Sequence, residues 1–147
     1  MSLGYYSRTD GQQAADSTLI GNSTGAAFFT IRKDLSDTDV EFLAYENSRR
    51  TEGADDTMAE YAGSCRAEND REGYRNGVSV DTDTGADARI SPNRTIYLGA
   101  ENDDNVAAKF SGDQCAGAYV ANGLSTAQVL AHYNAIQALN TTFNRQV

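Results

Sequence analysis

The order of hydrophobic and polar residues predicts a series of short β-strands followed by one helix. β-Branched and aromatic runs recur at intervals of roughly 8–12 residues, and clusters of Gly, Asn, Asp and Ser separate them. Such spacing favours an antiparallel β-sandwich or jelly roll. The expected strands are Leu3–Ser7, Thr18–Ile20, Ala27–Ile31, Val40–Tyr45, Met58–Arg66, Gly73–Arg75, Val78–Val80, Thr95–Gly99, Val106–Phe110 and Gln114–Ala121.

One turn stands out within this series, in the string "YRNGVSV". Asn76 and Gly77 both tolerate a positive φ, which the tightest two-residue hairpin turns require at both central positions. The string therefore predicts a hairpin between Tyr74 and Val78.

The predicted helix begins in "GLSTAQVLAHYNAIQAL" and covers residues 125–140, approximately. Ser125 is a favourable N-cap, and Gln128 three residues later completes a capping box. Leu124 and Val129 have the spacing of a hydrophobic staple.

An apolar stripe runs along this helix, because Val129, Tyr133, Ile136 and Phe143 recur at helical intervals. We expect the stripe to pack on a sheet as part of the core. The alternative is a helix that binds a partner.

Length and charge exclude several classes of protein. The 147 residues suit one domain, 1–147, and no apolar run approaches the ~18 residues of a membrane-spanning helix. The N-terminal residues lack the apolar centre of a secretion signal. The net charge is −9, and the span from Asp34 to Asp70 alone holds eleven acids against three arginines. Nucleic acid is thus excluded as a partner, and we expect a solvated acidic face.

The two cysteines, Cys65 and Cys115, both lie in predicted strands. They are too few for a disulfide scaffold, so we expect free buried thiols, with a single bridge as the alternative. His132 is the only histidine. Because no metal-ligand or triad spacing surrounds it, we expect an exposed or half-buried helix residue without a catalytic role.

The string "DTDVE" is the one hint of catalysis. Asp37, Asp39 and Glu41 alternate, so on a strand they would share one face, as the paired carboxylates of a glycosidase do. The string resembles the E-x-D-x-E strand of laminarinase-type glycosidases. It departs from that pattern at Asp37, where the family has its nucleophile, and the chain has no tryptophan to support a sugar. We therefore expect no active site here.

Two acidic turns are weak candidates for a calcium site: Asp81 and Asp83 in "DTDTG", and Asp103 and Asp104 in "ENDDN". Neither completes the ligand set of a calcium loop. Turns rich in Asp and Asn between strands account for both stretches, so we expect no metal and no other cofactor.

From about Tyr74 onward the sequence resembles laminin-G-like, concanavalin A-like jelly-roll modules. The motifs that carry the resemblance are "YRNGV", "RTIYLGAEN", "KFSGDQCAGAYV" and the helix string. In particular it resembles modules of this type in phage and prophage structural proteins, which also carry a "YSRT"-like strand. The implied fold is an all-β antiparallel sandwich with one C-terminal helix.

The same resemblance implies a non-enzymatic virion surface protein, such as a capsid decoration protein or a tail appendage, made in the host cytoplasm and bound to other virion proteins. The alternative is a lectin-like module that binds glycans. In that case Tyr5, Tyr6 and Asn102 are candidate contacts, since sugars need aromatic faces and planar hydrogen-bonding groups.

An oligomer is also expected. Related modules carry strands ahead of the "YYSRT" one, whereas Met1 lies two residues before it here. The missing strands would leave an open sheet edge, which invites strand addition from another chain. We expect a homo-oligomer, either a trimer or a particle-bound array, with its contacts near this region.

Overall fold

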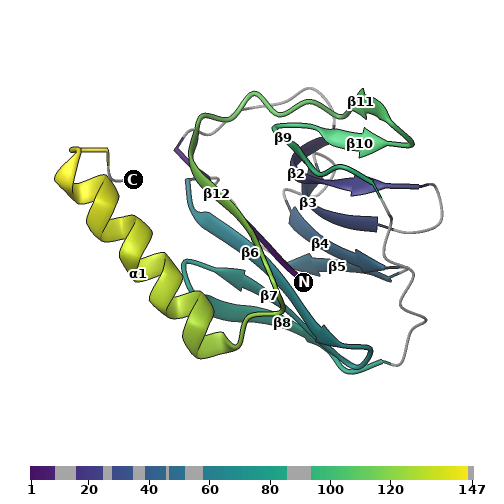
Figure 1. The fold of residues 1–147 in the computed structure, drawn as a ribbon, viewed down its shortest axis with the longest axis horizontal. Coiled ribbons are helices and arrows are strands. Elements are labelled where there is room, and N and C mark those ends of the chain that lie inside the picture. The colour runs from purple at the N-terminus through teal and green to yellow at the C-terminus, as the bar shows by residue number, and fades with distance from the viewer. Residues whose placement is uncertain are drawn as a thin grey trace.

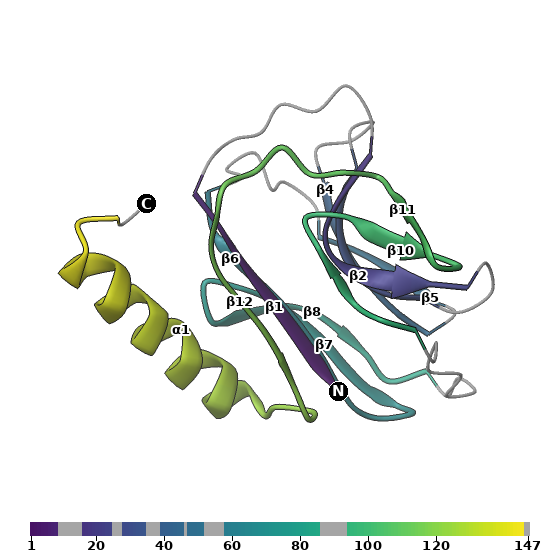
Figure 2. The ribbon, with the colours of Figure 1, turned by 45° about the horizontal axis from the view of Figure 1, so that its top comes forward.

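The computed structural model describes residues 1–8, 16–24, 28–34, 39–45, 47–51, 58–85 and 94–145. Two β-sheets pack face to face, and one helix lies against the outside of the first sheet (Figures 1 and 2). The predicted sandwich with one C-terminal helix is confirmed. Among the described residues no helix is long and apolar enough to span a membrane.

The first sheet has five antiparallel strands in the order β12-β1-β6-β7-β8. Their bounds are β1 (Ser2–Ser7), β6 (Glu60–Ala67), β7 (Asp70–Arg75), β8 (Val78–Asp83) and β12 (Cys115–Ala121). β1 therefore has a neighbour on each side and is not an edge strand. The prediction of an open edge at the "YYSRT" region is wrong, since the edges of this sheet are β12 and β8.

The second sheet follows the order β11-β10-β2-β3-β4-β5, and a seventh strand, β9, also pairs with β2. Its strands are β2 (Ser17–Ser23), β3 (Phe28–Asp34), β4 (Asp39–Tyr45), β5 (Asn47–Thr51), β9 (Tyr97–Leu98), β10 (Glu101–Asp103) and β11 (Val106–Ala108). The pairing of β10 with β2 is parallel. β5 and β10 were not expected from the sequence.

The core lies between the two sheets and is built from alternate residues of their strands. Leu3 and Tyr5 of the first sheet meet Phe29 and Ile31 of the second. Phe42 reaches across to Gly73, where a Cβ atom would lie 2.6 Å from the phenyl ring. Glycine at that position thus lets the sheets approach, as interior packing density requires.

The Asn76-Gly77 hairpin is confirmed. Asn76 has φ 52° and Gly77 has φ 74°, so both residues adopt the left-handed conformation that the turn requires. The Asn76 side chain also accepts a hydrogen bond from the backbone N–H of Glu60, at 2.9 Å. The turn is thereby fixed to the neighbouring strand β6.

Helix α1 (Thr126–Thr142) begins at the predicted N-cap. Ser125 and Gln128 form the capping box, and Leu124 packs against the cluster that contains Val129. The expected apolar stripe is confirmed at Val129, which is completely buried against the outside of the five-stranded sheet. It is wrong at Phe143, which is 55% exposed at the end of the helix.

Two further expectations need correction. Both cysteines are free, but only Cys65 is buried, whereas Cys115 on the edge strand β12 is exposed. The acidic span is not a uniformly solvated face, because Glu41 and Glu60 are buried.

Candidate functional site

The outer face of the seven-stranded sheet, which points away from the core, carries polar side chains that the register brings together. In the pairing of β2 with β3, Ile20 lies opposite Ile31 in the core and Gly21 lies opposite Thr30 on the other side. Arg32 lies two residues from Thr30 and so shares its side of the sheet. We call this surface the polar outer face; its described members are Thr18, Ser23, Thr30, Arg32, Glu41, Glu101 and Lys109.

Glu101 holds one half of this face together. Its carboxylate accepts hydrogen bonds from the Thr18 hydroxyl at 3.1 Å and the Ser23 hydroxyl at 2.8 Å. Lys109 Nζ donates to both carboxylate oxygens, at 3.2 and 3.1 Å. The parallel pairing of β10 with β2 places Glu101 directly beside Gly21, between the two hydroxyls.

Arg32 and Glu41 form the other half. They lie opposite each other on β3 and β4, and the guanidinium donates to the Glu41 carboxylate through Nε at 2.8 Å and through Nη2. Glu41 is fully buried, whereas the Arg32 side chain keeps 17% of its surface exposed. Burying a carboxylate requires such a partner, so the pair fixes both side chains.

Gly21 lies between the two halves, where Thr30 leaves no room for a side chain. Its φ is 155°, and a Cβ atom would lie 2.5 Å from the Thr30 methyl group. The Thr30 hydroxyl is buried and has no hydrogen-bond partner among the described residues. The Thr18, Ser23 and Thr30 hydroxyls are buried. Both acids of the face are neutralised by a base, and the groups that keep part of their surface exposed are the side chains of Arg32 and Lys109.

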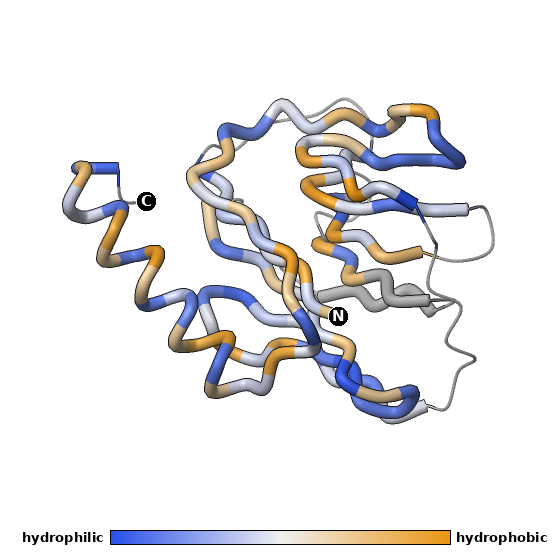
Figure 3. The backbone as a smooth tube through the Cα atoms, in the orientation of Figure 1, coloured by the Kyte–Doolittle hydropathy of each residue, from blue (hydrophilic) through white to orange (hydrophobic). Residues whose placement is uncertain are grey.

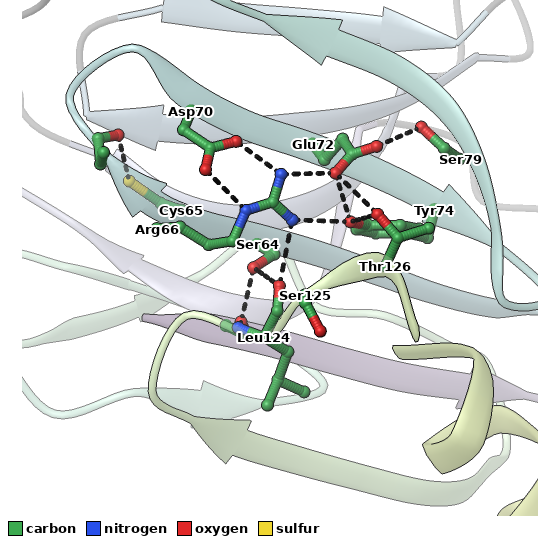
Figure 4. A network of polar contacts seen from close by, with 12 residues as sticks. Ser64, Cys65, Arg66, Asp70, Glu72, Tyr74, Ser79, Leu124, Ser125 and Thr126 are labelled. Carbon is green, nitrogen blue, oxygen red and sulfur yellow. Dashed lines mark hydrogen bonds and ion pairs between the residues drawn. The ribbon is translucent and has the colours of Figure 1, made fainter. Parts of the chain in front are cut away.

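A second polar network lies at the N-terminus of α1, beside strands β6 and β7 of the five-stranded sheet (Figure 4). Arg66 contacts Asp70 and Glu72, and it donates to the Tyr74 hydroxyl at 3.0 Å. Burial alone would raise the pKa of Glu72, but hydrogen bonds from three neighbours outweigh it and lower the pKa to about 2. Thr126, at the first turn of α1, also donates to Glu72 at 3.3 Å. Every group is paired within the chain, so this network anchors the helix.

The three glycan contacts predicted from the sequence lie elsewhere and are all buried. The Tyr5 hydroxyl donates to the Asp113 carbonyl at 3.2 Å, and the Tyr6 hydroxyl accepts from Gln137 at 2.8 Å beneath α1. The Asn102 amide donates to the Thr95 carbonyl at 2.7 Å. Each side chain has about 1% of its surface exposed, and this argues against contact with a ligand from solvent.

The weak calcium candidates do not come together. Asp83 forms a buried ion pair with Arg71, at 2.5 Å, and Asp104 pairs with Arg94 at 2.6 Å. Asp103 accepts a hydrogen bond from Ser23, and Asp81 lies on strand β8. Within the part of the chain that the structure describes, no group of three acidic, histidine or cysteine side chains could hold a metal ion.

The predicted "DTDVE" carboxylates are described only in part. Asp37 lies outside the described residues, and Asp39 is described only as the first residue of β4. Glu41 is ion-paired with Arg32 and buried, which leaves no free carboxylate at that position. His132 is half-buried on α1, as expected.

Arg32, Thr18 and Lys109 were not among the residues singled out from the sequence. A local signal existed in "FFTIRK", where Thr30 and Arg32 alternate with Phe29 and Ile31. That alternation predicts a strand with one apolar and one polar face, but the expected strand ended at Ile31, three residues before the end of β3 at Asp34.

The fold is similar to that of solved carbohydrate-binding modules. The CBM40 of the Ruminococcus gnavus IT-sialidase matches with a TM-score of 0.65 and 15% identity, over 90% of this chain and 80% of that one. The same module bound to α2,3 sialyllactose matches with a TM-score of 0.63 and 14% identity, over 90% and 80%. Its complex with α2,6 sialyllactose matches with a TM-score of 0.57 and 14% identity, over 88% of this chain and 79% of that one. No family model and no curated protein sequence matches the chain. At these identities the likeness shows a shared β-sandwich fold.

Proposed function

We propose that this chain is a non-catalytic glycan-binding module and that the polar outer face is its site. The observation that carries the proposal is the similarity, over nine-tenths of the chain, to modules solved with sialyllactose bound. A sandwich of this kind can host many functions, so the site must be argued from its own chemistry.

The polar outer face supplies groups that suit a sugar. The Arg32 guanidinium is partly exposed and presents several donors in a fixed plane. Its partner Glu41 holds it in place, so little side-chain entropy is lost when a ligand binds.

A glycan array that contains both neutral and sialylated oligosaccharides tests the proposal. Binding of any glycan class by the wild-type chain supports it, and absence of binding across the array refutes it. Arg32→Lys keeps the charge beside buried Glu41 but loses the planar fork, so we expect weaker binding at nearly unchanged stability.

The matched control is Arg94→Lys, because Arg94 forms an exposed ion pair with Asp104 outside the polar outer face. The control should bind as the parent does. Equal binding by Arg32→Lys and the parent would show that the site lies elsewhere. The same samples should not hydrolyse β-glucans, and turnover that Glu41→Gln abolishes would instead establish the glycosidase.

The assignment to a virion surface, with other virion proteins as partners, rests on the sequence resemblance and stays a prediction. It is compatible with glycan binding, since a binding module can be part of a larger particle. Copurification of the chain with a particle, in a fixed copy number, is the measurement that tests it.

A further inference from the structure

Phe110 is an aromatic side chain that folding leaves in solvent. It follows β11, with 65% of its surface exposed, whereas Tyr5, Tyr6, Tyr61 and Tyr74 are all buried. Figure 3 shows β10 as hydrophilic and β11 beside it as hydrophobic, at the border of the sheet. The ring therefore contributes little to the core and is accessible to a ligand.

The backbone around Phe110 is fixed on both sides. Lys109 accepts a hydrogen bond from the Thr18 N–H at 2.8 Å, and the Ser111 N–H donates to the Gly99 carbonyl at 2.8 Å. Phe110 itself forms a parallel bridge with Thr18. The ring is thus carried on a rigid segment, which reduces the entropy lost on binding.

This segment also contains an unfavourable backbone conformation. Lys109 has φ 48°, and every other described non-glycine residue with a positive φ is Asn or Asp. The left-handed region is unfavourable for a lysine, because its Cβ atom crowds the following carbonyl oxygen there. The bonds of its ammonium group to Glu101 help to hold it there. Backbone strain maintained in this way is concentrated at ligand sites.

The bridge also sets the direction of the ring. Bridge partners point to the same side of a sheet, and Thr18 belongs to the polar outer face through its bond to Glu101. Phe110 therefore borders that face, beside Lys109. A rigid apolar ring next to fixed polar groups is the combination that a sugar ring requires, with C–H groups on one side and hydroxyls at its rim.

We infer that Phe110 is the apolar platform of the glycan site and stacks on the C–H face of a hexopyranose. The inference rests on the proposed function and adds a ligand class to it. Because Glu101 neutralises Lys109 and Glu41 neutralises Arg32, contact with the sugar ring provides much of the affinity. Binding is accordingly expected to depend only weakly on salt concentration.

The test compares Phe110→Ala, Phe110→Tyr and Phe143→Ala by calorimetric titration. The ligands are lactose, α2,3-sialyllactose and the strongest glycan from the array. Phe143 is similarly exposed, at 55%, but lies at the end of α1. We expect Phe110→Ala to weaken binding about tenfold with an unchanged melting temperature. Phe110→Tyr and Phe143→Ala should bind as the parent does.

The outcomes separate the two proposals. A parent that binds glycans and a Phe110→Ala variant that binds them equally well would overturn the platform but leave the glycan-binding function in place. A parent that binds no glycan in titration or on the array would overturn both. A tenfold loss that Phe110→Tyr fails to restore would also count against stacking.

Discussion

His132 Nδ1 lies 3.6 Å from Glu60 Oε1, at the interface of α1 with the five-stranded sheet. Neither carboxyl oxygen of Glu60 has a hydrogen-bond partner among the residues that the structure describes, and the side chain is almost completely buried. The imidazole contacts the Tyr119 ring, with 3.9 Å between centroids and an angle of 44° between the ring planes. Burial raises the pKa of Glu60 to about 7 and lowers the pKa of His132. The two groups therefore favour their neutral forms at this interface.

This interface should make stability depend on pH. A carboxyl whose pKa rises from 4.5 to about 7 on folding binds its proton more tightly in the folded state. Its contribution to stability is fully present below pH 4.5 and is lost as the pH rises through about 7. As the pH rises from about 5 to 8, the free energy of unfolding of Glu60→Gln should increase relative to that of the parent by on the order of 2–3 kcal/mol. Urea melts across this range measure the difference.

His132 works in the opposite direction below its ordinary pKa, because its neutral form is favoured in the folded state. His132→Asn in both backgrounds removes that contribution and serves as the control. If the free energy of unfolding of the parent and of Glu60→Gln changed with pH in the same way, Glu60 would not be the group that makes stability depend on pH.

The capping box should contribute measurably to stability. Ser125→Ala removes the hydroxyl that accepts from the Gln128 N–H, leaving that amide at the helix start without a side-chain partner. The expected loss is about 0.5–2 kcal/mol in the free energy of unfolding. Ser125→Asp, another good N-cap, should restore most of it. Chemical denaturation gives both values, and a Ser125→Ala protein as stable as the parent would contradict the prediction.

Val129 is the best-buried residue of α1, and its truncation should lower the free energy of unfolding more than loss of the Ser125 cap does. Val129→Ala removes two methyl groups from a cluster with Ala62 and Tyr74. We expect a loss of about 1–3 kcal/mol. Leu130→Ala, one residue further along and 43% exposed, should cost far less. Equal stabilities of these two variants would mean that the helix does not pack as described.

Calcium should have little effect on the melting temperature. Asp83 and Asp104 are engaged by arginines, and the acidic turns do not converge within the described part of the chain. A real site would raise the melting temperature by mass action. Differential scanning fluorimetry with millimolar calcium, then with a chelator, measures the shift. A chelator-reversible rise of several degrees would refute the prediction.

The fold was largely predictable because its strongest signals are local. The Asn76-Gly77 turn and the Ser125 cap each depend on residues within a few positions of one another. β5 and β10 escaped prediction because "NSRRT" and "END" are polar, and neighbouring strands hold them in place. Strand formation of this kind depends on context rather than propensity.

The polar outer face was not predictable, for a different physical reason. Thr18 and Arg32 lie opposite each other because β2 pairs with β3, and Glu101 joins them because β10 pairs in parallel with β2. Nothing near Glu101 in the sequence indicates Thr18 as its partner. The aromatic residues that looked accessible, Tyr5 and Tyr6, are instead buried on the two sides of β1.

The central place of β1 has a consequence for how the chain folds. Ser2 pairs with Ala121 on one side and with Ser64 on the other. The pairing of β1 with β12 therefore cannot form until the roughly 120 residues that separate Ser2 from Ala121 have been synthesised. Closing so long a loop before contacts form slows folding to the millisecond-to-second range. During synthesis β1 thus remains without β12, and the nascent chain exposes the apolar residues of β1 during that time.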